Sequence, residues 1–144
     1  RIYDTGNNGV YKSGFASTQA AYEAAVHPLF DTLDGLEERL DGRTHLVGDH
    51  LTEADWRLFT TLIRFDLVYH LHFKCNRNRL IDYPNLWDYT RALYQVPGVA
   101  DTVNFAHIVR HYHYSHETIT PHRILPISPS LDFDAPTKRT PTLP

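Results

Sequence analysis

The chain has 144 residues, of which 42% are hydrophobic and 22% charged, and its formal net charge is -3. This composition predicts one folded globular domain and excludes a largely disordered chain. No stretch approaches the roughly 20 consecutive apolar residues that span a bilayer, so we expect no membrane partner. A slightly acidic chain also lacks the clustered basic side chains on which nucleic-acid binding depends, and we expect no nucleic-acid partner.

The number of cysteines gives an indication of the cellular compartment. Cys75 is the only cysteine in the sequence, so no disulfide can form within the chain. A lone thiol is typical of reducing compartments, and we therefore expect a cytoplasmic protein. The chain begins with Arg1 and contains no methionine. We therefore expect it to be a part of a longer protein.

The first residues are interpreted as the end of a helix. A loop is predicted at residues 6–14, because Gly6-Asn7-Asn8-Gly9 is typical of a turn. From Thr18 to Leu40, apolar residues recur at spacings of three and four, which predicts an amphipathic helix. Pro28 lies inside this helix, where it removes a backbone donor. We therefore expect a kink or a break at Pro28.

The clearest helix start in the sequence is Leu51-Thr52-Glu53-Ala54-Asp55-Trp56. Thr52 is a typical capping residue, Asp55 is the acid three positions later, and apolar residues flank both. The segment that follows is apolar around most of its circumference as far as Phe73. Such a pattern predicts a helix in the centre of the domain.

Two further helices complete the expected fold. One starts at Asp82-Tyr83-Pro84, with proline in the first turn, and ends at Pro97-Gly98; the other starts at about Asp101. No alternating strand pattern is present. Prolines recur beyond Pro121 and favour extended backbone. We predict an all-α helical domain at residues 1–125, followed by an extended, proline-rich tail at residues 126–144.

Histidines are the first candidates for chemistry. The sequence has ten, and those near the end of the fourth helix fall close together: His107, His111, His113 and His116. His107 and His111 lie one helical turn apart, but no zinc-binding motif accompanies them, and His70 and His72 point to different helical faces. We favour solvated or aromatic-packed histidines over a metal site and expect no metal.

Cys75 is the second candidate, because Lys74, Arg77 and nearby His72 are positive or can become so and would favour a reactive thiolate. Against this, the residue follows a helix C-terminus, whose dipole disfavours a thiolate. We favour a structural thiol over a nucleophile.

Charged residues of the central helix are given structural roles. Asp66 is predicted to be a partly buried acid that needs an arginine or a backbone donor. Arg57 and Arg64 lie on the polar strip of the same helix. We expect both arginines to pair with surface carboxylates.

Tyrosines are the more suggestive residues. Tyr11 lies in the expected glycine-rich loop, and Tyr69 and Tyr112 lie near the ends of apolar helical faces. A phenol can donate a hydrogen bond to an anion or exchange a proton. Position alone favours aromatic packing residues with satisfied hydroxyls, so spacing does not decide between the two interpretations.

Several motifs in unbroken order from Ile2 to about Pro126 resemble the C-terminal domain of the glutathionyl-hydroquinone reductases, which are xi-class, omega-like glutathione transferases. They are NNGVYKSGFA at residues 7–16, LTEAD at 51–55, RFDxVY at 64–69, HFKCN at 72–76, YQVPGV at 94–99 and TVNF at 102–105. The resemblance implies a glutathione-transferase C-terminal-type helical bundle. The tail departs from the family, whose usual Pro-x-Gly-Ile is Pro121-His122-Arg123-Ile124 here.

The resemblance further implies one half of a two-domain enzyme. In the family, a thioredoxin-like N-terminal domain, absent from this chain, binds glutathione as co-substrate and supplies the nucleophilic cysteine, while the helical domain forms the wall for the aromatic substrate. The enzyme removes glutathione from S-glutathionyl hydroquinones and yields hydroquinone and oxidised glutathione. The 144-residue chain alone is therefore expected to be inactive. A homodimer is also implied.

The resemblance assigns roles to three tyrosines. Tyr11 matches the proton donor or acceptor for the hydroquinone, and Tyr69 and Tyr112 match tyrosines that favour the thiolate of the active-site cysteine. Cys75 matches a cysteine that the family does not use as its nucleophile. The alternative is a non-catalytic scaffold or protein-interaction module. Convergence of the three phenols on one cleft favours the reductase, and their dispersal favours the scaffold.

Overall fold

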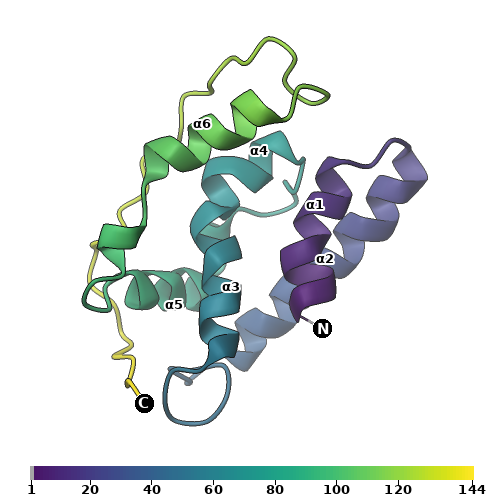
Figure 1. The fold of residues 1–144 in the computed structure, drawn as a ribbon. Helices are drawn as coiled ribbons and strands as arrows, with labels where there is room; N and C mark the ends of the chain where they lie inside the picture. Colours follow the sequence, from purple (N-terminus) through teal and green to yellow (C-terminus); the bar gives the residue numbers. More distant parts are fainter. Residues whose placement is uncertain (1) are drawn as a thin grey trace.

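Helices make up all the regular structure at residues 2–144, the part of the chain that the computed structural model describes. The long segment α3 (Glu53–Arg64), η2 (Phe65–Tyr69) and α4 (His70–His72) runs through the middle of the molecule, as Figure 1 shows. On one side of it lie α1 (Asn8–Gly14) and α2 (Gln19–Arg39), and on the other side lies α6 (Phe105–Ser115). The predicted all-α fold is confirmed.

The core forms where these helices meet around the central segment. Its fully buried side chains come from α1, α2, α3, η2 and α5 (Pro84–Tyr94) and include Val10, Leu29, Leu33, Leu62, Phe65, Val68, Leu86 and Leu93. Burial of large apolar side chains supplies the main driving force for this packing, at roughly 1.5–3 kcal/mol for each.

The predicted loop at residues 6–14 is wrong. A π-helical turn, η1 (Ile2–Asn7), leads directly into α1, so the Gly-Asn-Asn-Gly motif is helical. At the end of α1, Gly14 lets the helix backbone lie directly against the ring of Phe73. A Cβ at this position would lie only 2.0 Å from Cδ1 of Phe73. The side chain of Asn7 then fastens this helix to α3 by donating to Arg57 O at 2.7 Å and Thr61 Oγ1 at 2.6 Å.

The predicted helix over Thr18–Leu40 is confirmed as α2, with Thr18 as its N-cap and Leu40 as its C-cap. The helix continues through Pro28, so the expected break is wrong, whereas the expected kink stays a prediction. Proline costs about 3 kcal/mol in a helix interior. Val26 before Pro28 and Leu29 and Leu33 after it are buried, so they hold the helix against the core and offset that cost.

The predicted start of the central helix is also confirmed. The carboxylate of Asp55 accepts hydrogen bonds from the backbone N and the hydroxyl of Thr52, both at 2.8 Å. Its other oxygen accepts from Leu46 N at 2.9 Å and from the Tyr89 hydroxyl at 2.7 Å. This fully buried acid therefore caps α3 and ties it to the preceding loop and to α5 (Pro84–Tyr94).

The fourth expected helix begins later than predicted. A short 3-10 turn, η4 (Ala100–Thr102), comes first, and α6 starts after Asn104, whose side chain accepts from His107 N. The Asn104 side chain satisfies a backbone N–H in the first turn of α6, and this cap fixes the start of the helix there. The third helix begins with Pro84 in its first turn, as predicted, after the 3-10 turn η3 (Leu80–Asp82).

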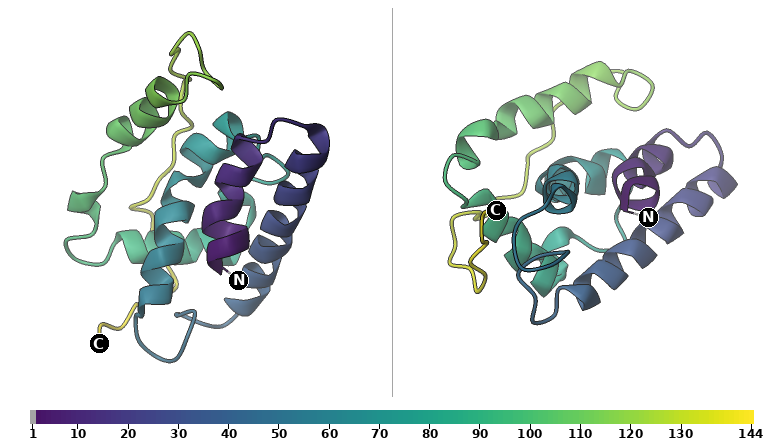
Figure 2. Two further views of the ribbon diagram at one scale, coloured as in Figure 1. Left: turned by 45° about the vertical axis from the view of Figure 1, so that its right-hand side comes forward. Right: turned by 60° about the horizontal axis from the view of Figure 1, so that its bottom comes forward.

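The last segment, residues 121–144, contains no helix or strand and returns past α6 and α5 toward the loop before α3, as Figure 2 shows. Phe133 is buried and stacks on Phe105 at 5.0 Å. Arg139 forms an ion pair with Asp88 and donates to Leu40 O. Near the end, Leu51 N donates to Thr142 O at 2.8 Å. The segment is thus fastened to the helices by side-chain and backbone contacts.

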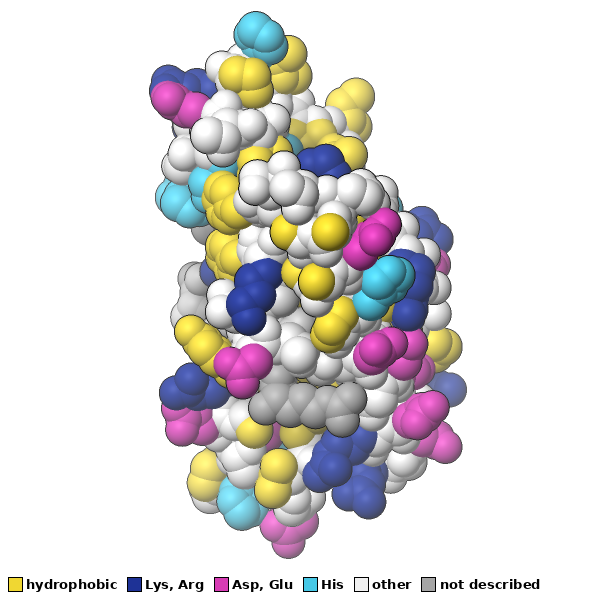
Figure 3. Space-filling view, turned by 90° about the vertical axis from the view of Figure 1, so that its right-hand side faces the viewer, with side chains coloured by type: hydrophobic (Ala, Val, Ile, Leu, Met, Phe, Trp, Pro, Cys, Tyr) yellow, Lys and Arg dark blue, Asp and Glu magenta, His cyan; other side chains and the backbone are white. Residues whose placement is uncertain are grey.

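Two surface properties bear on partners. Within residues 2–144, no helix is long and apolar enough to cross a membrane. On the face that carries α1 and α2, basic and acidic side chains are interspersed rather than gathered by sign, as Figure 3 shows.

Candidate active site

Three tyrosine hydroxyls meet at one point between α1 and α6. The hydroxyls of Tyr11 and Tyr112 are 2.6 Å apart, and those of Tyr112 and Tyr69 are 2.9 Å apart. Tyr112 therefore bridges the other two in a continuous hydrogen-bonded chain. We call Tyr11, Tyr69 and Tyr112 the phenol cluster.

A different element positions each member of the phenol cluster. Tyr11 lies on α1, Tyr69 ends η2, and Tyr112 lies on α6. The π-helical turn matters for Tyr69, because it adds one residue per turn and places Tyr69, five positions after Arg64, beside the same cavity. Val68, four positions after Arg64, is fully buried in the core instead.

Phe73 forms the floor of the phenol cluster. Its ring stacks on Tyr69 at a centroid distance of 5.6 Å and meets Tyr11 edge-on at 5.3 Å. The close approach of Gly14 allows α1 to lie directly against Phe73. Rigid aromatic packing of this kind fixes the directions of the hydroxyls.

The cluster opens into a cavity of about 480 Å³. Its lining comes from α1, α3, η2 and α6 and from Asn7, and consists of Asn7, Tyr11, Thr60, Thr61, Arg64, Tyr69, His107, Ile108, His111 and Tyr112. No carboxylate belongs to this lining. The cavity therefore offers hydrogen-bond donors and positive or neutral groups, which suits a hydroxylated or anionic ligand.

The electrostatics keep the inner phenols protonated. Burial, together with the neighbouring hydroxyl of Tyr112, raises the pKa of Tyr69 well above its usual value. Burial also raises the pKa of Tyr112 to about 12. At neutral pH both side chains are thus neutral hydrogen-bond donors. Tyr11 is 37% exposed and is the member that a ligand in the cavity reaches most readily.

Cys75 does not belong to this site. Its side chain is fully buried, and burial raises the pKa of the thiol to about 12. The thiol lies 3.8 Å from Phe73 O and close to Ser13. A buried protonated thiol is a poor nucleophile, so these contacts support the structural interpretation of Cys75.

Five of the ten histidines, namely His72 on α4 and the four on or next to α6, form two groups. His72, His113 and His116 pack together, with His72 Nε2 and His116 Nδ1 2.9 Å apart and the rings of His72 and His113 4.6 Å apart. His107 and His111 instead line the cavity. Among residues 2–144, no group of three or more histidine, cysteine or acidic side chains is arranged to hold a metal ion.

The charged residues of the central helix have distinct environments. Asp66 is buried and accepts hydrogen bonds from the backbone N of Leu80 and Ile81, so the predicted backbone donor is confirmed. Burial nonetheless raises the pKa of Asp66. Arg57 pairs with Glu53, as predicted.

The expectation for Arg64 is wrong. Its guanidinium donates to the backbone oxygen of Thr60 rather than to a surface carboxylate, and it lines the cavity. Sequence reasoning also missed Asn7 as a lining residue. For Arg64, the sequence signal was that Thr60, Arg64 and Tyr69 share one face of the central helix. The π-helical turn at Phe65–Tyr69 hides this relation, because it changes the spacing from four residues to five.

The difference from the family pattern at residues 121–124 affects the backbone conformation. Arg123 adopts a φ of 53°, in the left-handed region that favours glycine. The family pattern has glycine at this position. Arg123 also forms an ion pair with Glu117, which holds the turn closed after α6.

Comparisons with known proteins agree with this architecture. The chain is 58% identical over 130 residues to glutathionyl-hydroquinone reductase PcpF of Sphingobium chlorophenolicum, covering 90% of this chain and 42% of that protein. It is 55% identical over 135 residues to glutathionyl-hydroquinone reductase YqjG of Escherichia coli, covering 94% and 41%. The chain therefore spans less than half the length of these relatives.

Solved structures give the same result. The glutathione-bound structure of YqjG, a glutathione transferase homologue from Escherichia coli K-12, matches with a TM-score of 0.94 and 54% identity, over 96% of this chain and 45% of that one. Glutathione S-transferase Xi from Phanerochaete chrysosporium matches with a TM-score of 0.88 and 57% identity, over 98% and 44%. The family model for the glutathione S-transferase C-terminal domain matches residues 19–92. The chain belongs to the glutathione S-transferase C-terminal domain family.

Proposed function

We propose that this chain is the hydroquinone-binding half of a glutathione-dependent reductase that removes glutathione from S-glutathionyl hydroquinones. The observation that carries the proposal is the convergence of Tyr11, Tyr69 and Tyr112 on one cavity. A reductase needs these phenols together, whereas a scaffold needs none of them. The names of the relatives PcpF and YqjG support the same substrate class.

The proposed reaction begins with a cysteine thiolate of a thioredoxin-like N-terminal domain. The thiolate attacks the sulfur of the substrate thioether, a sulfur–sulfur bond forms, and the bond between sulfur and the ring carbon breaks. The ring carbon keeps the electron pair and takes up a proton, which gives the free hydroquinone. A second glutathione thiolate then attacks the mixed disulfide, releasing oxidised glutathione and the enzyme thiolate.

The phenol cluster has two proposed roles in this sequence. Tyr11, the most exposed member, exchanges a proton with the hydroxylated ring. Tyr69 and Tyr112 donate hydrogen bonds toward the active-site sulfur and so favour its thiolate. Their raised pKa values support this role, because a donor must keep its proton at neutral pH.

The proposal includes partners. Glutathione is the co-substrate and binds mainly to the N-terminal domain; the relative YqjG has a glutathione-bound structure. The N-terminal domain docks over Tyr11 and the open side of the cavity. We further propose a cytoplasmic location, since the free thiol of Cys75 suits a reducing compartment. The proposed homodimer follows from the family resemblance alone. The chain alone lacks the nucleophile and is expected to be inactive.

The test is glutathione-dependent release of hydroquinone by the full-length protein that contains this chain. We expect Tyr11→Phe to lower kcat about 100-fold, because general acid–base groups typically contribute 10²–10⁴-fold. Tyr114→Phe is the matched control, since Tyr114 is 36% exposed and Tyr11 37%. Absence of turnover by the intact wild-type protein would reject the reductase in favour of the scaffold.

A further inference from the structure

A second cavity adjoins the one that holds the phenol cluster. Its volume is about 560 Å³, and it lies between α3 and the segment from Gly98 to Ile108. The two cavities share four lining residues, Thr60, Arg64, His107 and Ile108. They therefore meet along one side of α3 and form a single elongated space.

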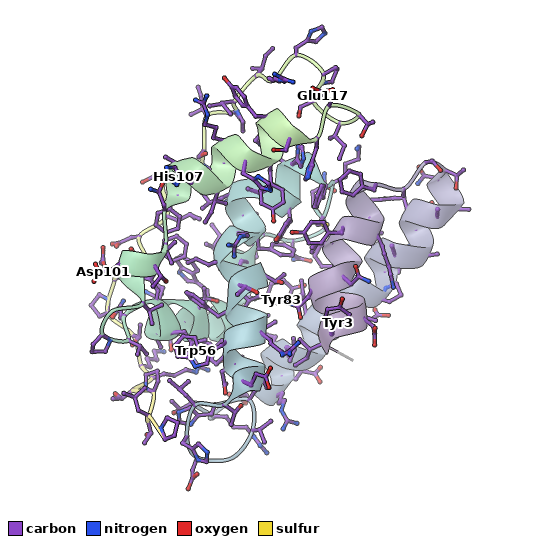
Figure 4. All side chains as sticks on the ribbon, in the orientation of Figure 1. Tyr3, Trp56, Tyr83, Asp101, His107 and Glu117 are labelled. Atoms are coloured by element: carbon purple, nitrogen blue, oxygen red, sulfur yellow. The ribbon has the colours of Figure 1, made fainter. Side chains whose placement is uncertain are left out.

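The second cavity differs chemically from the first. Side chains of Trp56, Phe59, Ile63, Val99 and Val103 dominate its walls, and no acidic residue belongs to the lining. Trp56 and Phe59 meet edge-on with their ring centroids 6.0 Å apart. Figure 4 labels Trp56 on α3 and His107 at the start of α6, which bound this space. Such a wall favours an apolar ligand group.

Arg64 stands where the two cavities meet. It is half-buried and donates to Thr60 O within its own helix, and no ion pair engages it in the part of the chain that the structure describes. Its side chain lines both cavities. A ligand that crosses this point therefore meets polar groups at one end and hydrocarbon at the other.

The combined volume exceeds what a simple ring requires. A cavity of about 150 Å³ already holds benzene. The phenol-side cavity of about 480 Å³ is thus large enough for a hydroquinone ring with room for the thioether. The second cavity is left for another part of the substrate.

We propose that the second cavity receives an apolar substituent of the hydroquinone ring, so that the preferred substrates are S-glutathionyl hydroquinones carrying a hydrocarbon chain or a second aryl group. The inference deepens the proposed function and rests on it. Bond changes at the sulfur are the same as for an unsubstituted ring. Transfer of the substituent from water into the cavity strengthens substrate binding. Each buried methylene adds about 0.8 kcal/mol, which raises the affinity about fourfold.

The experiment compares two substrates in the full-length protein, S-glutathionyl hydroquinone and its analogue with an eight-carbon alkyl chain on the ring. The measured quantity is the ratio of kcat/KM for the alkylated substrate to that for the simple one. We expect this ratio to exceed ten in the wild type. Val103→Trp, which fills the second cavity, is expected to lower it at least tenfold.

Two further variants keep the result interpretable. Val103→Thr keeps the size of the side chain but adds a hydroxyl, and we expect a smaller fall in the ratio, of about threefold. Val47→Trp adds the same bulk at an exposed valine elsewhere, and the ratio should stay at the wild-type value. A wild-type ratio near one, or an unchanged ratio in both Val103 variants, would overturn the inference.

A binding measurement separates this inference from the proposed function. Calorimetry with the free alkyl hydroquinone and with unsubstituted hydroquinone needs no turnover. Tighter binding of the alkylated ring that Val103→Trp abolishes would support the cavity assignment even if neither thioether were cleaved, in which case only the reductase proposal would fail. Equal binding of both rings would overturn the cavity assignment.

Discussion

Tyr89 and Tyr112 are both buried phenols on helices of the same domain, yet their surroundings are opposite. Tyr89 is fully buried and donates to the carboxylate of Asp55 inside a closed network. Among residues 2–144, Tyr112 shares side-chain hydrogen bonds only with other phenols, and it lines a cavity. Burial raises the pKa of both phenols.

The comparison shows how the tyrosine that we propose to be functional, Tyr112, differs from a structural one, Tyr89. Residue type, burial and pKa direction are the same at the two positions, so none of these separates them. What separates them is the partner. A carboxylate that already accepts four hydrogen bonds satisfies Tyr89 completely, whereas a chain of hydroxyls leaves Tyr11, Tyr69 and Tyr112 able to redirect a proton toward a ligand.

The largest expected effect comes from opening the closed network. Asp55→Ala leaves the donors of Leu46, Thr52 and Tyr89 without their acceptor. We expect the free energy of unfolding to fall by about 4 kcal/mol, since each buried unpaired group costs about 1–3 kcal/mol. Urea denaturation measures this. Tyr89→Phe, which removes one donor with its bond, should cost about 1 kcal/mol, and a larger loss than for Asp55→Ala would contradict this ranking.

Next in size is the contact beneath the phenol cluster. Gly14→Ala places a Cβ against the ring of Phe73, and we expect a loss of about 3 kcal/mol in the free energy of unfolding, because overpacking forces side chains and backbone to shift. Gly9→Ala on the same helix is the control. A Cβ there would lie 3.5 Å from Leu29 Cβ, an ordinary contact, so stability should change little. Equal effects at both glycines would show that helix propensity, not packing, governs α1.

The smallest expected effect is the pH dependence of the histidine group beside Phe73. Burial lowers the pKa of His72 to about 4, and burial also lowers the pKa values of His113 and His116. The unfolded chain, with histidine pKa values near 6.5, therefore binds more protons than the folded one between pH 6.5 and 4. Stability is fully present above pH 6.5 and is lost progressively as the pH drops through this window.

The charges that face His72 are those of His113, His116 and Lys74. Asp66 acts in the opposite sense, because burial raises its pKa and its protonation favours the folded state at low pH. The measurement is therefore the difference between the wild type and His72→Gln in urea midpoints from pH 7 to 4.5. A flatter dependence in His72→Gln is expected, and identical slopes would contradict the assignment.

The sequence by itself determined the helices that carry strong local signals. Thr18 and Thr52 marked helix starts, Pro84 marked the first turn of α5, and apolar spacing fixed the buried faces. These signals are reliable because caps and periodicity act within a few residues. The backbone donors of Asp66 were also foreseeable, since a buried carboxylate requires them.

Only the tertiary structure decided the rest. Residues 6–14 are helical because Gly14 lies against Phe73. This contact joins distant parts of the chain, so local turn propensity does not predict it. Tyr11 and Tyr112 are 101 positions apart, and their hydrogen bond depends on how α1 and α6 pack on the central segment. Arg64 lines the cavity because of that same packing. Local interactions determine where helices form, but a site built from three helices forms only when the packing of the core brings them together.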